Sequence, residues 1–592
     1  MQPNIQVTPD TNTQRDIAIG RVVSVSGSQA IIMLDNTRVS SMTAMHNRPD
    51  IGAVLRIYTS VATVYGMISG LSIPVPVQNG QAGEEVWIAE VELVGELQEN
   101  ADRTEKEFGR GVSIYPCLGD LAYVATLEDL ELVYDTNTDS SISIGHITQA
   151  PTIPAMVRVN DLLGKHFAIL GTTGTGKSCA VALVLQKILQ HNPLGHIVLL
   201  DPHDEYSAAF PNNAEIIRPS DLHLPYWFFT FEEIVEVLVG SKAGRETEVE
   251  ILAELIPMAK MRFSSRENKQ QASLRKGGEA VTHSVDSPVP YRVTDLVKLL
   301  DERMGKLDHK RDVWAHKQLK YRLEALMQDP RYAFMFGSNT VQDHMSDVLG
   351  RIFRIPVNDK PISILHLSGL PSEIVNVVVS VLCRMTFDLG LWSNGAIPIT
   401  LICEEAHRYI PTDPSLGFEP TRRSIARIAK EGRKYGVSLC IVSQRPSELD
   451  QTILSQCNTV FAMRMSNEKD QNIVSAAISD AGAGMLEFLP SLGNREVIAF
   501  GDGMPFPARL RLNKLSEDEM PRGCTALFTE KWKQEAGNTE MLTDVVERWR
   551  TSGSMYIGST MNADSVNQRL VDLGPEYRGR GPTTPFPKDK SE

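Results

Sequence analysis

The sequence predicts an α/β protein with a largely parallel central sheet, preceded by a small β-barrel domain and interrupted by a helical insertion. Three observations support this prediction. The first part of the chain alternates apolar and polar residues between Gly-bearing turns. It is followed by apolar strands that are separated by amphipathic helices. Long helical patterns interrupt this series of strands and helices. The chain has 592 residues, of which 42% are hydrophobic and 22% charged, so it is long enough for several domains.

The first predicted domain spans residues 1–150. Between residues 19 and 134, the segments IGRVVSVSGSQAIIMLD and EEVWIAEVELVGELQE alternate small polar residues with branched apolar ones. This alternation is typical of a small barrel or sandwich. Residues 135–150, DTNTDSSISIGHITQA, are polar and small, and we interpret them as a linker or loop.

Seven apolar segments predict the strands of a second domain, whose two parts span residues 151–230 and 356–515. They are HFAILG (166–171), HIVLLD (196–201), PISILHLSG (361–369), AIPITLIC (396–403), VSLCIVSQ (437–444), TVFAMRM (459–465) and REVIAFGDG (495–503). Residues 231–355 have long helical patterns instead and predict a helical insertion. We expect a helical segment at 516–572 and a flexible tail at 573–592, which is rich in Pro, Gly and charge.

The cysteines, the net charge and the apolar stretches exclude several classes of protein. The seven cysteines are scattered and mostly lie in apolar runs, so we interpret them as reduced thiols rather than disulfides or a zinc site. A net charge of −14 argues against a surface that coats DNA, and any nucleic-acid contact must be local. The polar N-terminus and the strand-length apolar stretches, such as residues 397–403, predict neither a signal peptide nor a membrane span. We therefore expect a cytoplasmic protein that is not associated with a membrane.

The segment GTTGTGKS matches the pattern GxxxxGK[ST] between an apolar strand and a helix, which is the context that this phosphate-binding loop requires. Its backbone amides would converge on phosphates at a helix N-terminus. The predicted nucleotide-binding residues are Gly171, Thr172, Thr173, Gly174, Thr175, Gly176, Lys177, Ser178 and Cys179. The expected cofactors are ATP and Mg²⁺, with Lys177 between the β- and γ-phosphates and Ser178 as a Mg²⁺ ligand.

Hydrolysis of a bound nucleotide also needs acidic groups. Glu404 and Glu405 follow the buried strand at 396–403, at the carboxyl end where open α/β sheets bind ligands. We expect Glu404 to hold Mg²⁺ through water and Glu405 to polarise the attacking water. Gln444 ends the strand at 437–444, and its amide could contact both a γ-phosphate oxygen and that water.

Two interpretations remain open for the segment DPHDEY at 201–206. If its strand lies next to the strand of the phosphate loop, its acids could tune the metal or the base. The same acids could instead cap the following helix, since Asp is favoured at helix starts.

A basic segment, TRRSIARIAKEGRK, spans residues 421–434 and contains one acid. Arg433 is our preferred finger to a neighbouring subunit's γ-phosphate, with Arg427 as the alternative. Arg422, Arg423 and Lys430 are candidates to contact DNA phosphates. A solvated basic helix without either role is the simpler alternative.

Together the motifs GTTGTGKS, DPHDEY, CEEAHRYIP and EGRKYGVSLCIVSQRPSELDQTILSQCNT, with the N-terminal IGRVVSVSG, closely resemble the HerA family of P-loop ATPases over residues 15–510. The resemblance implies a RecA-like ATPase domain with a barrel and a helical insertion, a hexameric ring, and translocation on duplex DNA. It also implies a partner, a NurA-type nuclease or a Sir2-like or nuclease effector of antiphage defence, docked on the barrel.

Two residues depart from the family pattern. Glu404 stands where many relatives have Asp, which keeps the charge and lengthens the side chain. Lys165 stands where some relatives have an arginine suggested to approach the phosphates, and Lys lacks the bidentate fork of Arg.

The sequence therefore supports one main hypothesis and two alternatives. The main one is an ATP-hydrolysing motor that translocates on or unwinds double-stranded DNA with a partner nuclease or effector. The first alternative is a nucleotide-regulated ring scaffold that assembles an effector. The second, weaker because no membrane segment is expected, is a conjugation or secretion ATPase.

Overall fold

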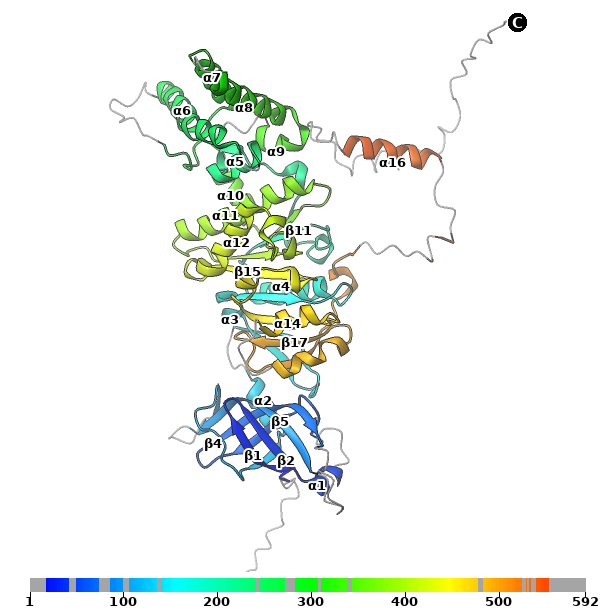
Figure 1. The fold of residues 1–592 in the computed structure, drawn as a ribbon. Helices are drawn as coiled ribbons and strands as arrows, with labels where there is room; N and C mark the ends of the chain where they lie inside the picture. Colours follow the sequence, from blue (N-terminus) through cyan, green and yellow to red (C-terminus); the bar gives the residue numbers. More distant parts are fainter. Residues whose placement is uncertain are drawn as a thin grey trace, which may run out of the picture.

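The computed structural model describes residues 17–41, 49–73, 86–99, 106–135, 140–240, 244–271, 283–306, 310–337, 343–476, 483–523, 529, 532–533 and 539–552. Three parts follow one another along the long axis of the molecule, namely a β-barrel, a sheet covered by helices, and a group of helices at the end opposite the barrel (Figure 1). The predicted tail at 573–592 lies outside the described residues.

The N-terminal part is a closed barrel. Its strands are β1 (Gly20–Ser26), β2 (Gln29–Leu34), β3 (Val54–Tyr58), β4 (Ala62–Ser72), β5 (Trp87–Glu99), β6 (Lys106–Arg110) and β7 (Leu121–Val124). They pair in the order β2-β1-β7-β3-β4-β5-β6, and an additional β2–β5 pairing closes a ring of six strands. Alternate residues such as Ile32, Leu55 and Val91 fill its core, as the period-2 pattern predicted. Helices α1 (Asn36–Ser41) and α2 (Leu127–Tyr134) accompany the strands.

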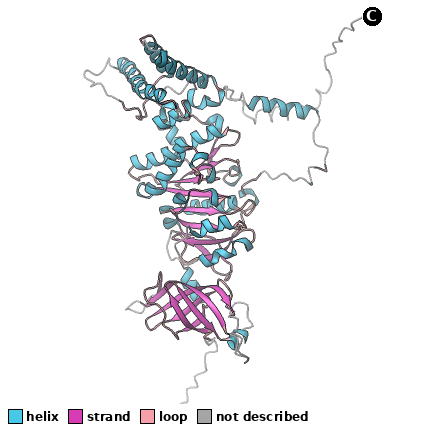
Figure 2. Cartoon of the chain, viewed as in Figure 1, coloured by secondary structure: helices cyan, strands magenta, loops and turns pink. Residues whose placement is uncertain are grey.

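The central part is built on an eleven-stranded sheet with the order β12-β13-β11-β14-β15-β10-β16-β17-β18-β8-β9. All seven predicted strands are present, as β10 (His166–Leu170), β11 (His196–Asp201), β13 (Ile362–His366), β14 (Ile399–Cys403), β15 (Val437–Ser443), β16 (Cys457–Ala462) and β17 (Glu496–Gly501). The strands from β12 to β16 in this order are parallel. Helices cover the sheet (Figure 2), as buried parallel strands require. This architecture confirms the predicted fold class.

The sequence missed four strands of this sheet. They are β8 (Ser141–Ile147), β9 (Pro154–Arg158), β12 (Ala214–Ile217) and β18 (Ala508–Leu512). The interpretation of residues 135–150 as a linker is wrong for 141–147, because β8 pairs antiparallel with β18 inside the central sheet. The first domain therefore ends before residue 140. Ser and Gly between the isoleucines of SISIGHI hid a strand that is buried mainly at its isoleucines.

Helices α3 (Val159–Gly164), α4 (Lys177–His191), α11 (Ser372–Trp392), α12 (Glu419–Glu431), α13 (Gln451–Leu454) and α14 (Glu468–Ala476) belong to the central part. The expectation that the longest apolar stretches are strand-length is wrong for α11, which is long and apolar enough to cross a membrane. In its most apolar window, 67% of the residues are buried inside the protein, because α11 packs against α12 and against strands β14 and β15.

Between β12 and β13 the described residues form helices and turns without a strand. The helices are α5 (Phe231–Leu238), α6 (Glu246–Gln271), α7 (Val293–Met304), α8 (Lys310–Gln328), α9 (Ala333–Phe336) and α10 (Met345–Phe353). Thr230 and Glu233 form a capping box that fixes the start of α5. Helices α6, α7 and α8 pack against one another and form the end of the molecule opposite the barrel (Figure 1). One further helix, α16 (Thr539–Ser552), lies in the C-terminal segment.

Aromatic packing and an ion pair join the barrel to the central part. The ring of Phe506 lies 5.9 Å from that of Phe108 in β6 and 5.6 Å from that of Tyr134 in α2. Beside it, Asp502 of the central part forms an ion pair with Arg110 of β6 at 3.6 Å and another with Lys165 of the central part itself. A buried aromatic cluster with charged pairs at its side therefore fixes how the barrel meets the sheet.

We predict that Phe506→Ala lowers the free energy of unfolding by about 3–5 kcal/mol, because it empties a fully buried aromatic site. The measurement is urea unfolding followed by circular dichroism. Leu194→Ala is the matched control, since that side chain is mostly exposed and its loss should cost less than about 0.5 kcal/mol. Equal midpoints for the two variants would contradict the assigned junction.

Candidate nucleotide-binding site

One edge of the central sheet gathers most of the candidate residues. Strands β11, β14, β15 and β10 are neighbours in that order and run parallel, so their carboxyl ends lie at the same edge. The idea that β11 lies directly beside β10 is wrong, because β14 and β15 separate them. The loops after all four strands nevertheless meet at this edge, as the contacts below show.

The phosphate loop follows β10 and leads directly into α4. Gly174 and Gly176 have φ values of 77° and 100°, a region that favours glycine. A Cβ on Gly171 would lie 2.7 Å from the Cβ of Met463, which follows the neighbouring strand β16, so this position requires a glycine. The loop is thus a tight turn at the N-terminus of a fifteen-residue helix, the geometry that binds phosphates.

Lys177 lies folded into the loop. Its Nζ donates to the carbonyl oxygen of Thr172 at 3.1 Å, which Thr175 Oγ1 also contacts at 2.8 Å. Burial lowers the pKa of Lys177, although Glu404 and Glu405 act in the opposite direction. The lysine is therefore desolvated, and acids lie close enough to influence its charge.

Glu404 and Glu405 follow β14, and both carboxyls are buried. Burial raises the pKa of Glu404 to about 8; Glu405 adds to this rise and Lys177 opposes it. Glu404 Oε2 has no hydrogen-bond partner among the described residues. Burial also raises the pKa of Glu405, whose backbone has φ 52°. Such a left-handed conformation in a non-glycine residue is strained and is often found at functional sites.

The sequence left two roles open for the acids of DPHDEY, which are to act on the metal or the base or to cap the following helix. The structure gives different contacts to different acids of this segment. Asp201 accepts hydrogen bonds from the backbone amides of His203, Glu205 and Tyr206 at 3.2, 3.2 and 3.0 Å, so it organises the turn. Glu205 instead accepts a hydrogen bond from Ser178 Oγ at 2.6 Å. The predicted metal ligand of the phosphate loop is thus in direct contact with an acid from β11's loop.

The sequence missed the surroundings of Glu405. His407 Nδ1 lies 3.3 Å from Glu405 Oε2 and 3.3 Å from Ser443 Oγ at the end of β15, and His203 Nε2 lies 3.9 Å from Glu405 Oε1. Burial lowers the pKa of His407 to about 4, so the ring is neutral at neutral pH. The motif CEEAH contains this histidine, but its spacing alone gave no reason to place it on the carboxylate.

Gln444 follows β15 and reaches the phosphate loop, where Thr173 Oγ1 donates to its side-chain oxygen. Pairing of β10 with β15 explains this contact, because Leu170 lies opposite Ser443 in the register. The amide predicted from a strand end thus lies beside the loop that would bind the γ-phosphate.

The residues fit a divalent cation. Glu404, Glu405 and Glu205 all influence the charge of Lys177, so three carboxylates share a partly buried site with one lysine. The unpaired oxygen of Glu404 and the hydroxyl of Ser178 are ligands of the kind that Mg²⁺ prefers. A bound cation would offset the excess negative charge.

The arginines of the basic segment contact acids of the same chain. Arg422 pairs with Glu419 and Asp450, both at 3.2 Å. Arg423 pairs with Glu419 at 3.0 Å and with Glu232 of the insertion at 2.6 Å. Lys430 is exposed on the same helix. DNA contacts by Arg422, Arg423 and Lys430 remain predictions, and the first two would have to exchange these partners.

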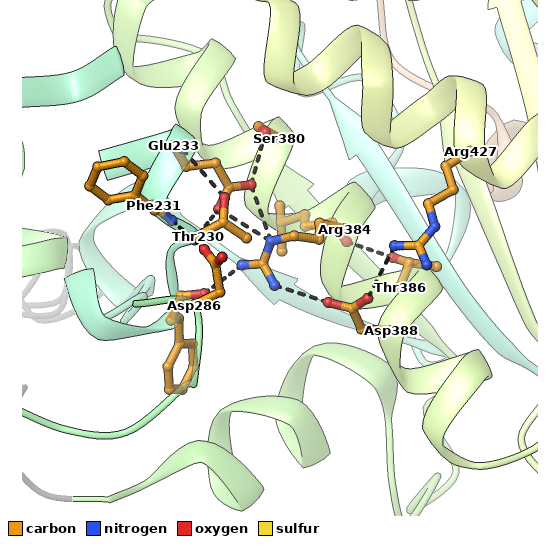
Figure 3. Close-up of polar contacts among 11 residues, drawn as sticks. Thr230, Phe231, Glu233, Asp286, Ser380, Arg384, Thr386, Asp388 and Arg427 are labelled. Atoms are coloured by element: carbon orange, nitrogen blue, oxygen red, sulfur yellow. Dashed lines mark hydrogen bonds and ion pairs between the residues drawn. The ribbon is translucent and has the colours of Figure 1, made fainter. Parts of the chain in front are cut away.

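Arg427 belongs to a separate cluster (Figure 3). Its guanidinium lies 4.1 Å from the ring centroid of Phe387 and 3.9 Å from Asp388. Asp388 also accepts from Arg384 at 3.1 Å, and Arg384 pairs with Glu233 of α5 at 3.2 Å. Glu233, Arg384, Phe387 and Arg427 of this cluster line a cavity of about 370 Å³ between α5, α11 and α12, and no residue of the phosphate loop lines it.

Arg433 and Lys165 lie at the other edge of the sheet. Arg433 is exposed and precedes β15, whereas the phosphate loop follows the carboxyl end of the adjacent parallel strand β10. Lys165 precedes β10 and pairs with Asp502. A strand of five residues separates these cations from the loop of their own chain by roughly 16 Å, so the structure brings neither of them to that loop.

Comparisons with known proteins show which proteins this chain is similar to. A family model described as "Helicase HerA, central domain" matches residues 142–386. The DNA double-strand break repair helicase HerA of Pyrococcus furiosus is 27% identical over 67% of this chain and 74% of its own length. A probable helicase of Methanocaldococcus jannaschii is 25% identical over 87% of this chain and 96% of its own length. Among solved structures, VirB4 of Thermoanaerobacter pseudethanolicus aligns with 64% of this chain and 99% of its own length, with 14% identity and a TM-score of 0.44.

We predict a pH-dependent effect of Glu404→Gln on the nucleotide-free protein. The folded-state pKa of about 8 lies above the value near 4.3 expected in the unfolded chain. The carboxyl therefore favours the folded state below pH 4.3, and this stability is lost as pH rises to about 8. The variant cannot ionise, so its melting temperature relative to that of the wild type should rise from pH 6 to about pH 8 and then level off. A difference that is constant over this range would contradict the assigned burial.

Proposed function

Because this chain belongs to the HerA family, we propose that it is an ATP-hydrolysing motor that acts on double-stranded DNA. One observation supports this most strongly. A phosphate loop, three carboxylates and a glutamine meet at one edge of a parallel sheet, and these are the groups that nucleotide hydrolysis requires. A protein that only bound nucleotide would need the loop alone.

In this proposal the loop amides of residues 171–178 and Lys177 bind the phosphates of ATP. Ser178 and Glu404 would hold Mg²⁺, and Glu205, which contacts Ser178, orients that hydroxyl. When bound, the cation neutralises charge that develops on the phosphate oxygens. Desolvation of Lys177 strengthens its attraction for phosphate, because charges interact more strongly in a site of low dielectric constant.

Glu405 acts as the base. It accepts a proton from the attacking water, whose oxygen bonds to the γ-phosphorus as the bond to the leaving ADP oxygen breaks. Burial raises the pKa of Glu405, which makes its carboxylate a stronger base than an exposed one. The neutral His407 ring lies 3.3 Å from that carboxylate, and Gln444 orients the water next to the loop.

Assembly into a ring, with six subunits as in the resemblance, would complete the site. Arg433 lies at the edge opposite its own loop and is exposed, so it suits a finger that enters a neighbour's site. Arg427 is the alternative, but it would first have to leave Phe387 and Asp388.

The proposal extends to partner and location. A nuclease or Sir2-like effector would dock on the barrel, which forms one end of the molecule (Figure 1), and the complex would work in the cytoplasm in DNA repair or antiphage defence. The scaffold alternative rests on the same barrel, because an aromatic junction fixes it to the ATPase part and could transmit the nucleotide state to an effector.

The test is steady-state ATPase activity of the purified chain with and without linear duplex DNA, together with its mass by light scattering. We expect a ring-sized particle whose activity DNA stimulates, and Lys177→Ala should reduce that activity by about 10²-fold or more. Lys187→Ala, on the same helix α4, is the matched control and should keep the activity.

ATPase activity that is indifferent to DNA in a ring-sized particle would favour the scaffold alternative. Activity that survives Lys177→Ala would contradict the proposed site itself.

A further inference from the structure

Helix α8 exposes two aromatic side chains on one face at the end of the molecule opposite the barrel (Figure 1). Trp314 is 62% exposed and Tyr321 is 58% exposed. They lie seven residues apart, which is two turns of a helix and about 10.5 Å. Lys317 stands between them, exposed, with its Nζ 5.8 Å from the centre of the Tyr321 ring. This face of α8 therefore carries two exposed aromatic rings with the cation of Lys317 between them.

Packing against α6 and α7 fixes the orientation of α8, so these side chains point outward. Its opposite face buries Ala315, His316, Leu319 and Leu323. Two ion pairs flank that buried face, since Lys320 pairs with Asp301 of α7 at 2.7 Å and Arg322 with Glu248 of α6 at 2.9 Å. Rotation of α8 that hid the aromatic rings would expose this core and break both pairs.

Local charge distinguishes this region from the rest of the protein. Residues 261–320 contain thirteen Lys and Arg against eight Asp and Glu, a net charge of +5, whereas the whole chain has −14. Lys298, Lys306 and Lys317 are exposed there. Part of this region is described, and in that part Lys317 is the cation that contacts the aromatic face.

Exposed aromatic rings with interspersed lysines suit single-stranded nucleic acid. Bases of a single strand can stack on Trp and Tyr, whereas duplex bases are already stacked on each other, and lysines attract the phosphates. At roughly 3.4 Å per nucleotide, about three nucleotides of a stacked strand span the distance between the rings. A protein partner would also use aromatic residues, but its binding would not require a basic excess.

We propose that the outer face of α8 binds single-stranded nucleic acid, with bases stacked on Trp314 and Tyr321 and phosphates near Lys317. In a motor that acts on duplex DNA this face would hold a separated strand, so the biological role rests on the proposed function. The binding itself does not depend on ATP hydrolysis.

The test is fluorescence anisotropy of a labelled oligothymidylate titrated with the full chain, in parallel with a labelled blunt duplex. We expect the double variant Trp314→Ala/Tyr321→Ala to weaken binding of the single strand by about tenfold or more. The matched control, Tyr115→Ala/Leu118→Ala, removes two exposed apolar side chains of the barrel region and should bind as the wild type does. Both double variants should melt at the wild-type temperature.

A third variant tests the charge. Lys317→Gln should reduce the slope of log affinity against log salt concentration by about 0.7 for the single strand, with a smaller loss of affinity than the aromatic variant shows.

Wild-type chain that does not bind the oligothymidylate, or an aromatic variant that binds it as tightly, would overturn the proposal and leave the face as a contact for protein. Duplex-stimulated ATPase activity, measured on the same samples, separates the two ideas. Loss of strand binding in the aromatic variant without any stimulation of the wild type would uphold this site and contradict the motor.

Discussion

The parallel pairing of β11, β14, β15 and β10 is the constraint on which the site depends. Each strand is short and fully or almost fully buried, so its position is fixed by the core and by the hydrogen bonds of two neighbours. Because all four strands point the same way, residues separated by more than 260 positions, such as Thr173 and Gln444, come into contact. The residues of the site are in loops, and the sheet fixes the ends of these loops.

Charge balance is the second feature of the site. Lys177 is the cation that the acids Glu205, Glu404 and Glu405 influence, and burial makes ionisation of Glu404 unfavourable. Ionised carboxyls in a buried place are costly unless a cation or hydrogen bonds compensate. In the nucleotide-free protein, burial therefore disfavours the charged forms of these acids and of the lysine. Mg²⁺ would stabilise the charged acids, and the phosphates would stabilise the charged lysine. Binding of the two together is favoured over binding of either alone.

The sequence predicted the parts of this structure that follow from local patterns. Strands with continuous apolar runs, such as 196–201, were found because a strand covered on both faces has few polar residues. The phosphate loop was found because its glycines and lysine have fixed spacing. Strand β8 was missed because Ser and Gly lie between its isoleucines, and helix α11 was not distinguished as a long apolar helix.

Contacts between distant segments could not be predicted in the same way. Strand order is a property of the whole fold, so the sequence left open whether β11 lies beside β10, and in the structure two strands separate them. The link from Ser178 to Glu205 and that from His407 to Glu405 depend on this order and on loop geometry. Similarly, Arg422 and Arg423 suggested a free basic surface because the sequence did not reveal that Glu232 and Asp450 lie beside them.

The central claim is that Glu405 activates the water while other groups bind the nucleotide. Its most direct test is a comparison of ATP binding and ATP turnover in Glu405→Gln, by calorimetry and by phosphate release, with Glu448→Gln, an exposed acid near β15, as the matched control. We expect Glu405→Gln to bind Mg-ATP within a few-fold of the wild type but to lose about 10²-fold or more in turnover. Turnover at the wild-type rate in Glu405→Gln would contradict it.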